Sequence, residues 1–180
     1  MGMQTLKRDD AEHFADVVDA VKAARVRPEL SLTEVPPPRR IAPHAVAFSA
    51  EVVDPRDDDA VLGTGRFVLL HDPAGPEAWH GTWRVVTFAR AELESEMATD
   101  PALGAVGWSW LVESLKDAGA TYTAEAGTVT RVVNESFAGL AERPSSVELE
   151  VRASWTPDGN DIAAHLQGWA TLMCTVAGLP

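Results

Sequence analysis

Residues 146–155 alternate without exception between apolar and polar side chains. The apolar set is Val147, Leu149, Val151, Ala153 and Trp155, and the polar set is Ser146, Glu148, Glu150, Arg152 and Ser154. Successive side chains of a β-strand point to opposite faces of its sheet, so the pattern predicts a strand with one face in a core. The polar set leaves the other face in water or against a partner, as antiparallel sheets allow.

Turn chemistry separates further strand-like segments along the chain. Residues 45–53, 64–71 and 82–89 have apolar side chains at strand spacing, and the apolar run 67–70 predicts burial on both faces. An acidic connection at 54–59 and the proline- and glycine-rich run 72–76 are the turns between them. Residues 121–133 predict one long strand, or two short strands broken near Gly127, and 29–35 a short edge strand.

Three amphipathic helices accompany these strands. The first is expected from Asp9 or Asp10 to about Arg25. The second starts at Asp100 or nearer Val106 and ends at Gly119. The third runs over about 161–177, and its apolar residues recur at spacings of four and three: Ile162, Leu166, Trp169, Met173 and Val176.

The order of these elements is helix, three strands, helix, two strands, helix. Short turns favour antiparallel neighbours, and helices with one apolar stripe cover one face of a sheet. The sequence therefore predicts an α+β two-layer sandwich with about five antiparallel strands. We expect one domain over 9–180, preceded by a flexible N-terminus at 1–8.

The charge balance restricts the partners. With 15 Lys plus Arg against 27 Asp plus Glu, the net charge is −12, which disfavours binding to nucleic acid and to anionic membranes. The chain has no apolar stretch of the ~18 residues that a membrane span requires, and no apolar run follows its basic N-terminal pair. The expected location is the cytoplasm.

The segment Trp79-His80-Gly81-Thr82-Trp83-Arg84 is the candidate ligand-binding site. If the strand begins early enough, the two tryptophans share one side, with His80 and Arg84 on the other. In that arrangement aromatic surface orients a ligand and Arg84 pairs with its acid group. The alternative is a tryptophan pair that only packs in the core. Trp108 joins the candidates because Trp108 and Trp110 cannot share a helix face, so one is expected near the surface.

Catalytic spacing is not found in the sequence, so no catalytic residue, metal ligand or cofactor is predicted. His71, Asp72 and His80 with the acidic residues at 54–59 lack the spacing of a metal site. Cys174 and His165 are nine residues apart, which places them on opposite faces of one helix. Cys174, the single cysteine, cannot form an internal disulfide.

Several segments together resemble an actinobacterial family of domains of unknown function, the one numbered three thousand. They are 70–75, 84–88, 107–111, 127–130, 152–157 and 169–179. The resemblance implies a cytoplasmic bacterial protein and no activity, cofactor or site residue. The order of elements is also similar to that of type III secretion chaperones, which are small, acidic, often dimeric proteins that bind other proteins. That second likeness is one of topology alone.

Three hypotheses follow. The first is a non-catalytic protein-binding or chaperone-like module with an unidentified protein partner. The second is a small-molecule-binding domain or enzyme with a site around Trp79 to Arg84. The third is a homodimer whose partner is a second copy of the chain.

Overall fold

The alternating segment forms strand β6 (Ser146–Asp158), which lies between β4 and β5 in a six-stranded antiparallel sheet of order β1-β2-β3-β4-β6-β5. The computed structural model describes residues 2–180. The other strands are β1 (Leu30–Val35), β2 (His44–Asp54), β3 (Asp57–His71), β4 (Trp83–Leu93) and β5 (Thr121–Asn134). The helices are α1 (Gly2–Ala23), α2 (Ser95–Ala98), α3 (Leu103–Asp117) and α4 (Ile162–Val176), with short 3-10 turns η1 (Glu77–Trp79) and η2 (Ala138–Leu140).

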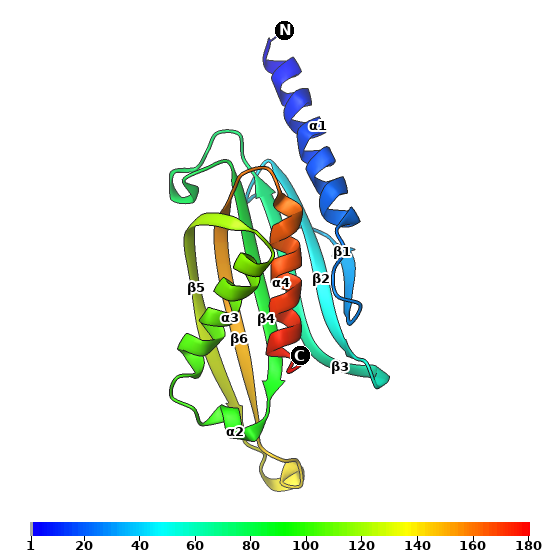
Figure 1. The fold of residues 1–180 in the computed structure, drawn as a ribbon, viewed down its shortest axis with the longest axis vertical. Coiled ribbons are helices and arrows are strands. Elements are labelled where there is room, and N and C mark those ends of the chain that lie inside the picture. Colours follow the sequence, from blue (N-terminus) through cyan, green and yellow to red (C-terminus); the bar gives the residue numbers. More distant parts are fainter. Residues whose placement is uncertain (1) are drawn as a thin grey trace.

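The helices α3 and α4 cover one face of this sheet, and α1 extends past its end at the top of Figure 1. The core lies between these layers. It contains the apolar side chains of β6 together with Phe67 of β3 and the buried stripe of α4. The α+β two-layer sandwich predicted from the sequence is confirmed, with a sixth strand because the edge segment β1 pairs along its whole length with β2.

The close approach of α3 to α4 depends on Gly168. A Cβ atom at this position would lie 3.0 Å from the Cα of Leu115 and 3.1 Å from the carbonyl oxygen of Ser114. Both are backbone atoms, which cannot rotate away, so a side chain here would push the helices apart. Asp161 begins α4, since its carboxylate accepts a hydrogen bond from the Ala164 N–H at 3.2 Å.

Several boundaries differ from the expected ones. Helix α1 begins at Gly2 rather than at Asp9 or Asp10, because Met3, Leu6 and Lys7 are good helix formers and continue the helix before the aspartates. Met1 lies outside the described residues, and the flexibility predicted for 1–8 stays a prediction. Strand β3 starts inside the acidic connection, at Asp57, because Asp54 and Asp57 pair across a tight turn.

Strand β5 is one long strand. The break expected near Gly127 is an irregularity between Thr123 and Ala126, where Ala124 has φ 53°. No helix within residues 2–180 is both long and apolar enough to cross a membrane.

A buried polar pair joins α4 to β6. The Trp155 indole N–H donates to Nδ1 of His165 at 2.9 Å, and both side chains are about 1% exposed. Burial lowers the pKa of His165 to about 4, because the charged ring would lose its hydration. His165 therefore acts as a neutral acceptor within the core.

Val151→Asp is expected to unfold the domain or cost on the order of several kcal/mol, because Val151 is 1% exposed and the carboxylate would have no partner there. Arg152→Ala, one position along and on the other face, is expected to change stability little. Thermal denaturation of both variants measures this. Equal melting temperatures would contradict the assignment of faces on β6.

Acidification is expected to destabilise the fold through His165. Its pKa falls from the ordinary value of 6.5, which applies to the unfolded chain, to about 4 in the folded protein. The unfolded chain therefore binds a proton that the folded chain excludes. The free energy of unfolding is unaffected above about pH 7 and falls by about 2 kcal/mol between pH 7 and pH 5.

His165→Gln, which still accepts a hydrogen bond but does not titrate, should reduce that fall in the free energy of unfolding, as measured by urea denaturation at the two pH values. Identical pH dependence in both proteins would disprove the assignment.

Candidate functional site

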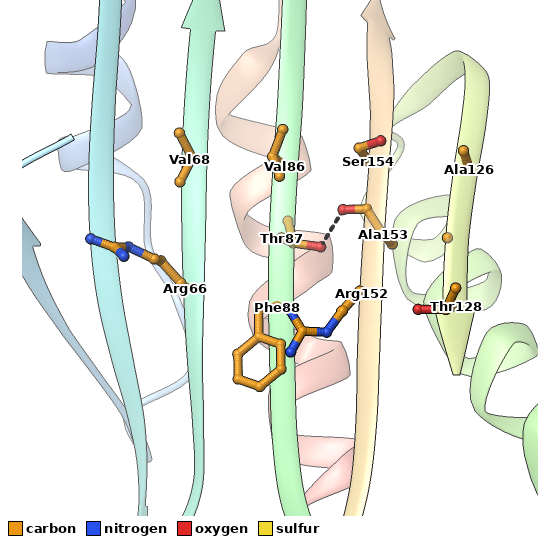
Figure 2. A pocket seen from close by; sticks show the side chains of 11 residues that line it. Arg66, Val68, Val86, Thr87, Phe88, Ala126, Thr128, Arg152, Ala153 and Ser154 are labelled. Carbon is orange, nitrogen blue, oxygen red and sulfur yellow. Dashed lines mark hydrogen bonds between the residues drawn. The ribbon is translucent and has the colours of Figure 1, made fainter. Parts of the chain in front are cut away.

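The sheet face opposite α3 and α4, called the open face below, has a shallow depression of about 410 Å³ at its centre. Its floor row consists of Val68, Val86, Ser154 and Ala126, which are cross-strand neighbours on β3, β4, β6 and β5. Figure 2 shows these side chains side by side, with the helices behind the sheet. Val86 is 39% exposed, so the middle of the sheet presents apolar surface to solvent.

A second row borders the floor on the same strands. This basic row consists of Arg66, Phe88, Arg152 and Thr128, again in direct register. The Arg152 guanidinium carbon lies 4.7 Å from the centre of the Phe88 ring, a cation–π contact that holds the arginine over β4. Figure 2 shows Arg66 directed away from them, toward β2. Its guanidinium donates to the Pro36 carbonyl oxygen at 3.3 Å.

A third arginine lies beside the floor row. Arg84 is 8% exposed and donates to the Ala124 carbonyl at 2.8 Å, the Thr156 hydroxyl at 3.0 Å and the Ser154 hydroxyl at 2.8 Å. Within the described part of the chain, no carboxylate lies within 4.0 Å of this guanidinium. Burial lowers the pKa of Arg84, but an arginine keeps its charge at physiological pH. Three of its five N–H donors are therefore paired with neutral oxygens, while its positive charge is not compensated.

The β2–β3 side of the open face is covered by the chain itself. Ala47, Val68 and Leu70 form a small apolar cluster, against which Ala42 and Trp79 pack. The Thr156 hydroxyl donates to the Trp79 carbonyl and so attaches this segment to β6. On this side of the depression, the segments that contain Ala42 and Trp79 therefore cover the sheet.

The structure divides the residues singled out from the sequence between the two faces. Strand β4 begins at Trp83, and Trp79 lies before it in η1, so the two tryptophans do not share a side. Trp79 and Arg84 lie at the open face, whereas Trp83 packs against the main core. His80 is exposed and has φ 51°. Whether any of them binds a ligand stays a prediction.

Trp108 lies on α3, with its ring close to Gly127 of β5. It packs against the main core, as does Trp110, and both are half-buried. A Cβ atom at Gly127 would lie 2.5 Å from the Trp108 ring, so the glycine provides the space for this indole against β5. Neither indole is fully buried, and whether Trp108 binds a ligand stays a prediction.

Trp83 belongs to an aromatic cluster that attaches α1 to the end of the sheet. Its ring stacks on His71 with the centroids 4.1 Å apart, and on Phe14 at 5.8 Å. His44 stacks on both Phe14 and His71. Burial lowers the pKa of His71, whose Nδ1 lies 3.0 Å from the Thr82 carbonyl oxygen. The histidine and Trp83 are thus used for packing of α1.

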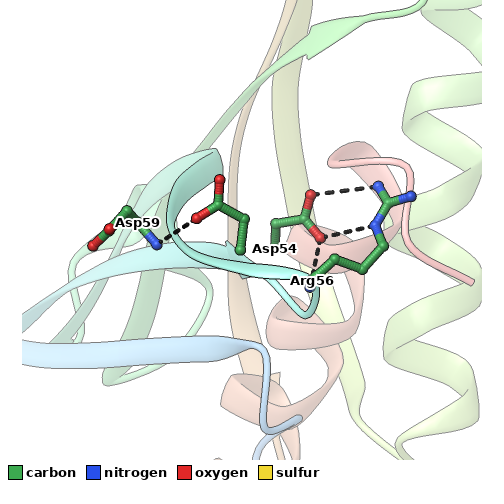
Figure 3. Close-up of polar contacts among 4 residues, drawn as sticks. Asp54, Arg56 and Asp59 are labelled. Atoms are coloured by element: carbon green, nitrogen blue, oxygen red, sulfur yellow. Dashed lines mark hydrogen bonds and ion pairs between the residues drawn. The ribbon is translucent and has the colours of Figure 1, made fainter.

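The acidic residues between β2 and β3 form local contacts, shown in Figure 3. The Asp54 carboxylate accepts hydrogen bonds from the Arg56 backbone N–H at 2.9 Å and its side chain at 3.2 Å, which lower the pKa of Asp54. The Asp57 carboxylate accepts from the Asp59 N–H at 3.1 Å. Among residues 2–180, no group of three or more His, Cys, Asp and Glu side chains is arranged to hold a metal ion.

Sequence reasoning missed Arg66, Phe88 and Arg152 as members of one site. The alternation within the predicted strand 82–89 indicates that Val86 and Phe88 share a face. Arg66 and Arg152, which flank Phe88, lie 86 residues apart in the chain, and only strand pairing brings them together.

A family model described as "Protein of unknown function (DUF3000)" matches residues 10–180. No curated protein and no solved structure matches the chain.

Trp83→Ala is expected to loosen α1, because the helix loses its stacking on the sheet end, at a cost of about 2 kcal/mol. Hydrogen–deuterium exchange should rise over residues 14–23. Trp79→Ala is the control, since Trp79 packs on the other face, and should leave the exchange of α1 unchanged. Equal exchange of α1 in wild type and Trp83→Ala would contradict the role given to Trp83.

Proposed function

We propose that this chain, which belongs to the DUF3000 family of proteins of unknown function, is a non-catalytic protein-binding module. The partner polypeptide lies on the open face, over the floor row and the basic row. The observation that carries the proposal is Val86, an apolar side chain 39% exposed at the centre of a six-stranded sheet. Contiguous apolar surface with a polar rim is typical of interaction sites, and Val86 lines the depression together with Phe88 and Ala126.

The chemistry of the lining supports binding rather than catalysis. The residues around the depression are Arg66, Val68, Val86, Thr87, Phe88, Ala126, Gly127, Thr128, Arg152, Ala153 and Ser154. They offer apolar contact and hydrogen-bond donors, but their side chains include no histidine, carboxylate or cysteine to act as a general base at neutral pH. A chaperone-like role agrees with the similarity in element order to type III secretion chaperones, which is analogy.

Binding of a small molecule is the second candidate. The depression has the volume of a ligand site, for which ~300–1,000 Å³ is usual, and Trp79 and Arg84 lie at its border. The depression is open to solvent, however, so a small ligand would stay largely in water. A second copy of the chain on the same face is the third candidate.

The proposal is tested by selecting peptides from a random phage-displayed library on the immobilised protein. Enriched peptides are then titrated against Val86→Asp and, as a matched control, Val112→Asp on the exposed side of α3. Val86→Asp should weaken binding at least about tenfold, since it places a charge in the apolar contact. Val112→Asp should bind as wild type.

Other outcomes would overturn the proposal. If no peptide is enriched, or if enriched peptides bind Val86→Asp as tightly as wild type, the open face is not a peptide-binding site. Native mass spectrometry of protein purified from its own host then distinguishes a small adduct from a homodimer.

A further inference from the structure

We propose that the segment bound on the open face is acidic and amphipathic, with apolar side chains on the floor row and carboxylates paired with Arg66 and Arg152. This inference rests on the proposed function and adds the chemistry of the partner. It runs against the net charge of −12, which by itself favours cationic partners.

The local charge of the depression is opposite to that of the whole chain. Its lining contains two arginines and no aspartate or glutamate. Arg84 adds a third positive charge next to Ser154. A charge held at the border of a protein surface acts in a lower dielectric than bulk water, so its attraction for an anion is less screened. The depression is thus a positive site on an acidic protein.

Arg66 has no carboxylate partner among the described residues, and the one ion pair of Arg152 there is long, at 3.6 Å. The hydrogen bond of Arg66 to Pro36 uses one guanidinium nitrogen, and no carboxylate among the described residues lies within 4.0 Å of it. Arg152 has an intramolecular carboxylate, Glu150, only at 3.6 Å, and its side chain is 62% exposed. Guanidinium groups bind carboxylates with two parallel hydrogen bonds, which is their strongest pairing.

The side chain of Arg152 is also ordered before binding. Its position over the Phe88 ring reduces the rotamer freedom that a long side chain loses on association. The backbone contact of Arg66 does the same. An anionic partner would therefore meet one guanidinium group over the Phe88 ring and a second directed toward β2.

The charges next to the basic row determine on which side of it the apolar part of the bound segment lies. Arg90 is already paired with Glu148 and lies 3.8 Å from Glu150, so the arginine of the next row is not available to an acidic partner. The apolar part of the segment must therefore lie on the other side, over Val86 and Ala126. This combination of charge and apolar contact distinguishes an acidic amphipathic segment from a basic one.

The composition of selected peptides tests this inference. The library selection is repeated on wild type, on the double variant Arg66→Gln/Arg152→Gln, and on Arg143→Gln, an exposed arginine outside the depression. Peptides from wild type and Arg143→Gln should be enriched in Asp and Glu next to apolar residues. Peptides from the double variant should keep the apolar residues and lose the acidic enrichment. Circular dichroism verifies that each variant is folded.

Affinity gives the quantitative test. A fluorescein-labelled peptide that was selected on the wild-type protein should bind the double variant about 10- to 100-fold more weakly than it binds the wild-type protein. This factor is expected for the loss of charge-assisted hydrogen bonds. The same peptide with each Glu and Asp replaced by Gln should lose affinity for the wild-type protein by a similar factor. Its affinity for the double variant should be close to that of the unchanged peptide for the double variant.

The outcomes separate the two proposals. Peptides that depend on Val86 but are poor in acids, or rich in lysine, would overturn the acidic partner and leave the binding surface intact. Acidic peptides whose affinity does not change in the double variant would also overturn it. Failure to obtain any peptide that depends on Val86 would overturn the proposed function itself.

Discussion

Burial of one face of the sheet under α3 and α4 is the constraint on which the rest of the structure depends. Helix α4 is apolar around most of its circumference, with Leu166, Trp169 and Met173 each at most 2% exposed. It fits against β3 because Gly65 has no side chain: a Cβ atom there would lie 2.5 Å from the Met173 sulfur. The polar link between Trp155 and His165 adds a directional contact, which a purely apolar interface does not have.

Because the helices cover one face of the sheet, the side chains on the other face do not have to pack in the main core. Its strands can then place arginines beside apolar side chains without the cost of burying charge. Arg84 shows the limit of this freedom, since it is buried at the border of the depression and donates to three neutral oxygens. The open face is therefore the part of the molecule in which side chains are least determined by folding and most available for binding.

Helix α1 depends on the body of the protein in a different way. Its last turns bury Val18 and Val21 in the main core, and Phe14 stacks on His44 and Trp83 at the end of the sheet. Its first residues, such as Met3 and Leu6, are exposed. Aromatic contacts of this kind are strong per residue but few. The first turns of α1, over residues 2–9, are exposed, whereas its last turns are part of the core.

The sequence by itself determined the class of the fold, the strand β6 and the stripe of α4, because apolar periodicity records which side of each element is buried. It also placed Val86 and Phe88 on one face of β4. Only the tertiary structure decided that Arg66 and Arg152 flank Phe88 and that Trp79 and Trp83 lie on opposite faces. The physical reason is that strand order and register are set by hydrogen bonds between segments far apart in the chain. Periodicity within one segment holds no information about its neighbours.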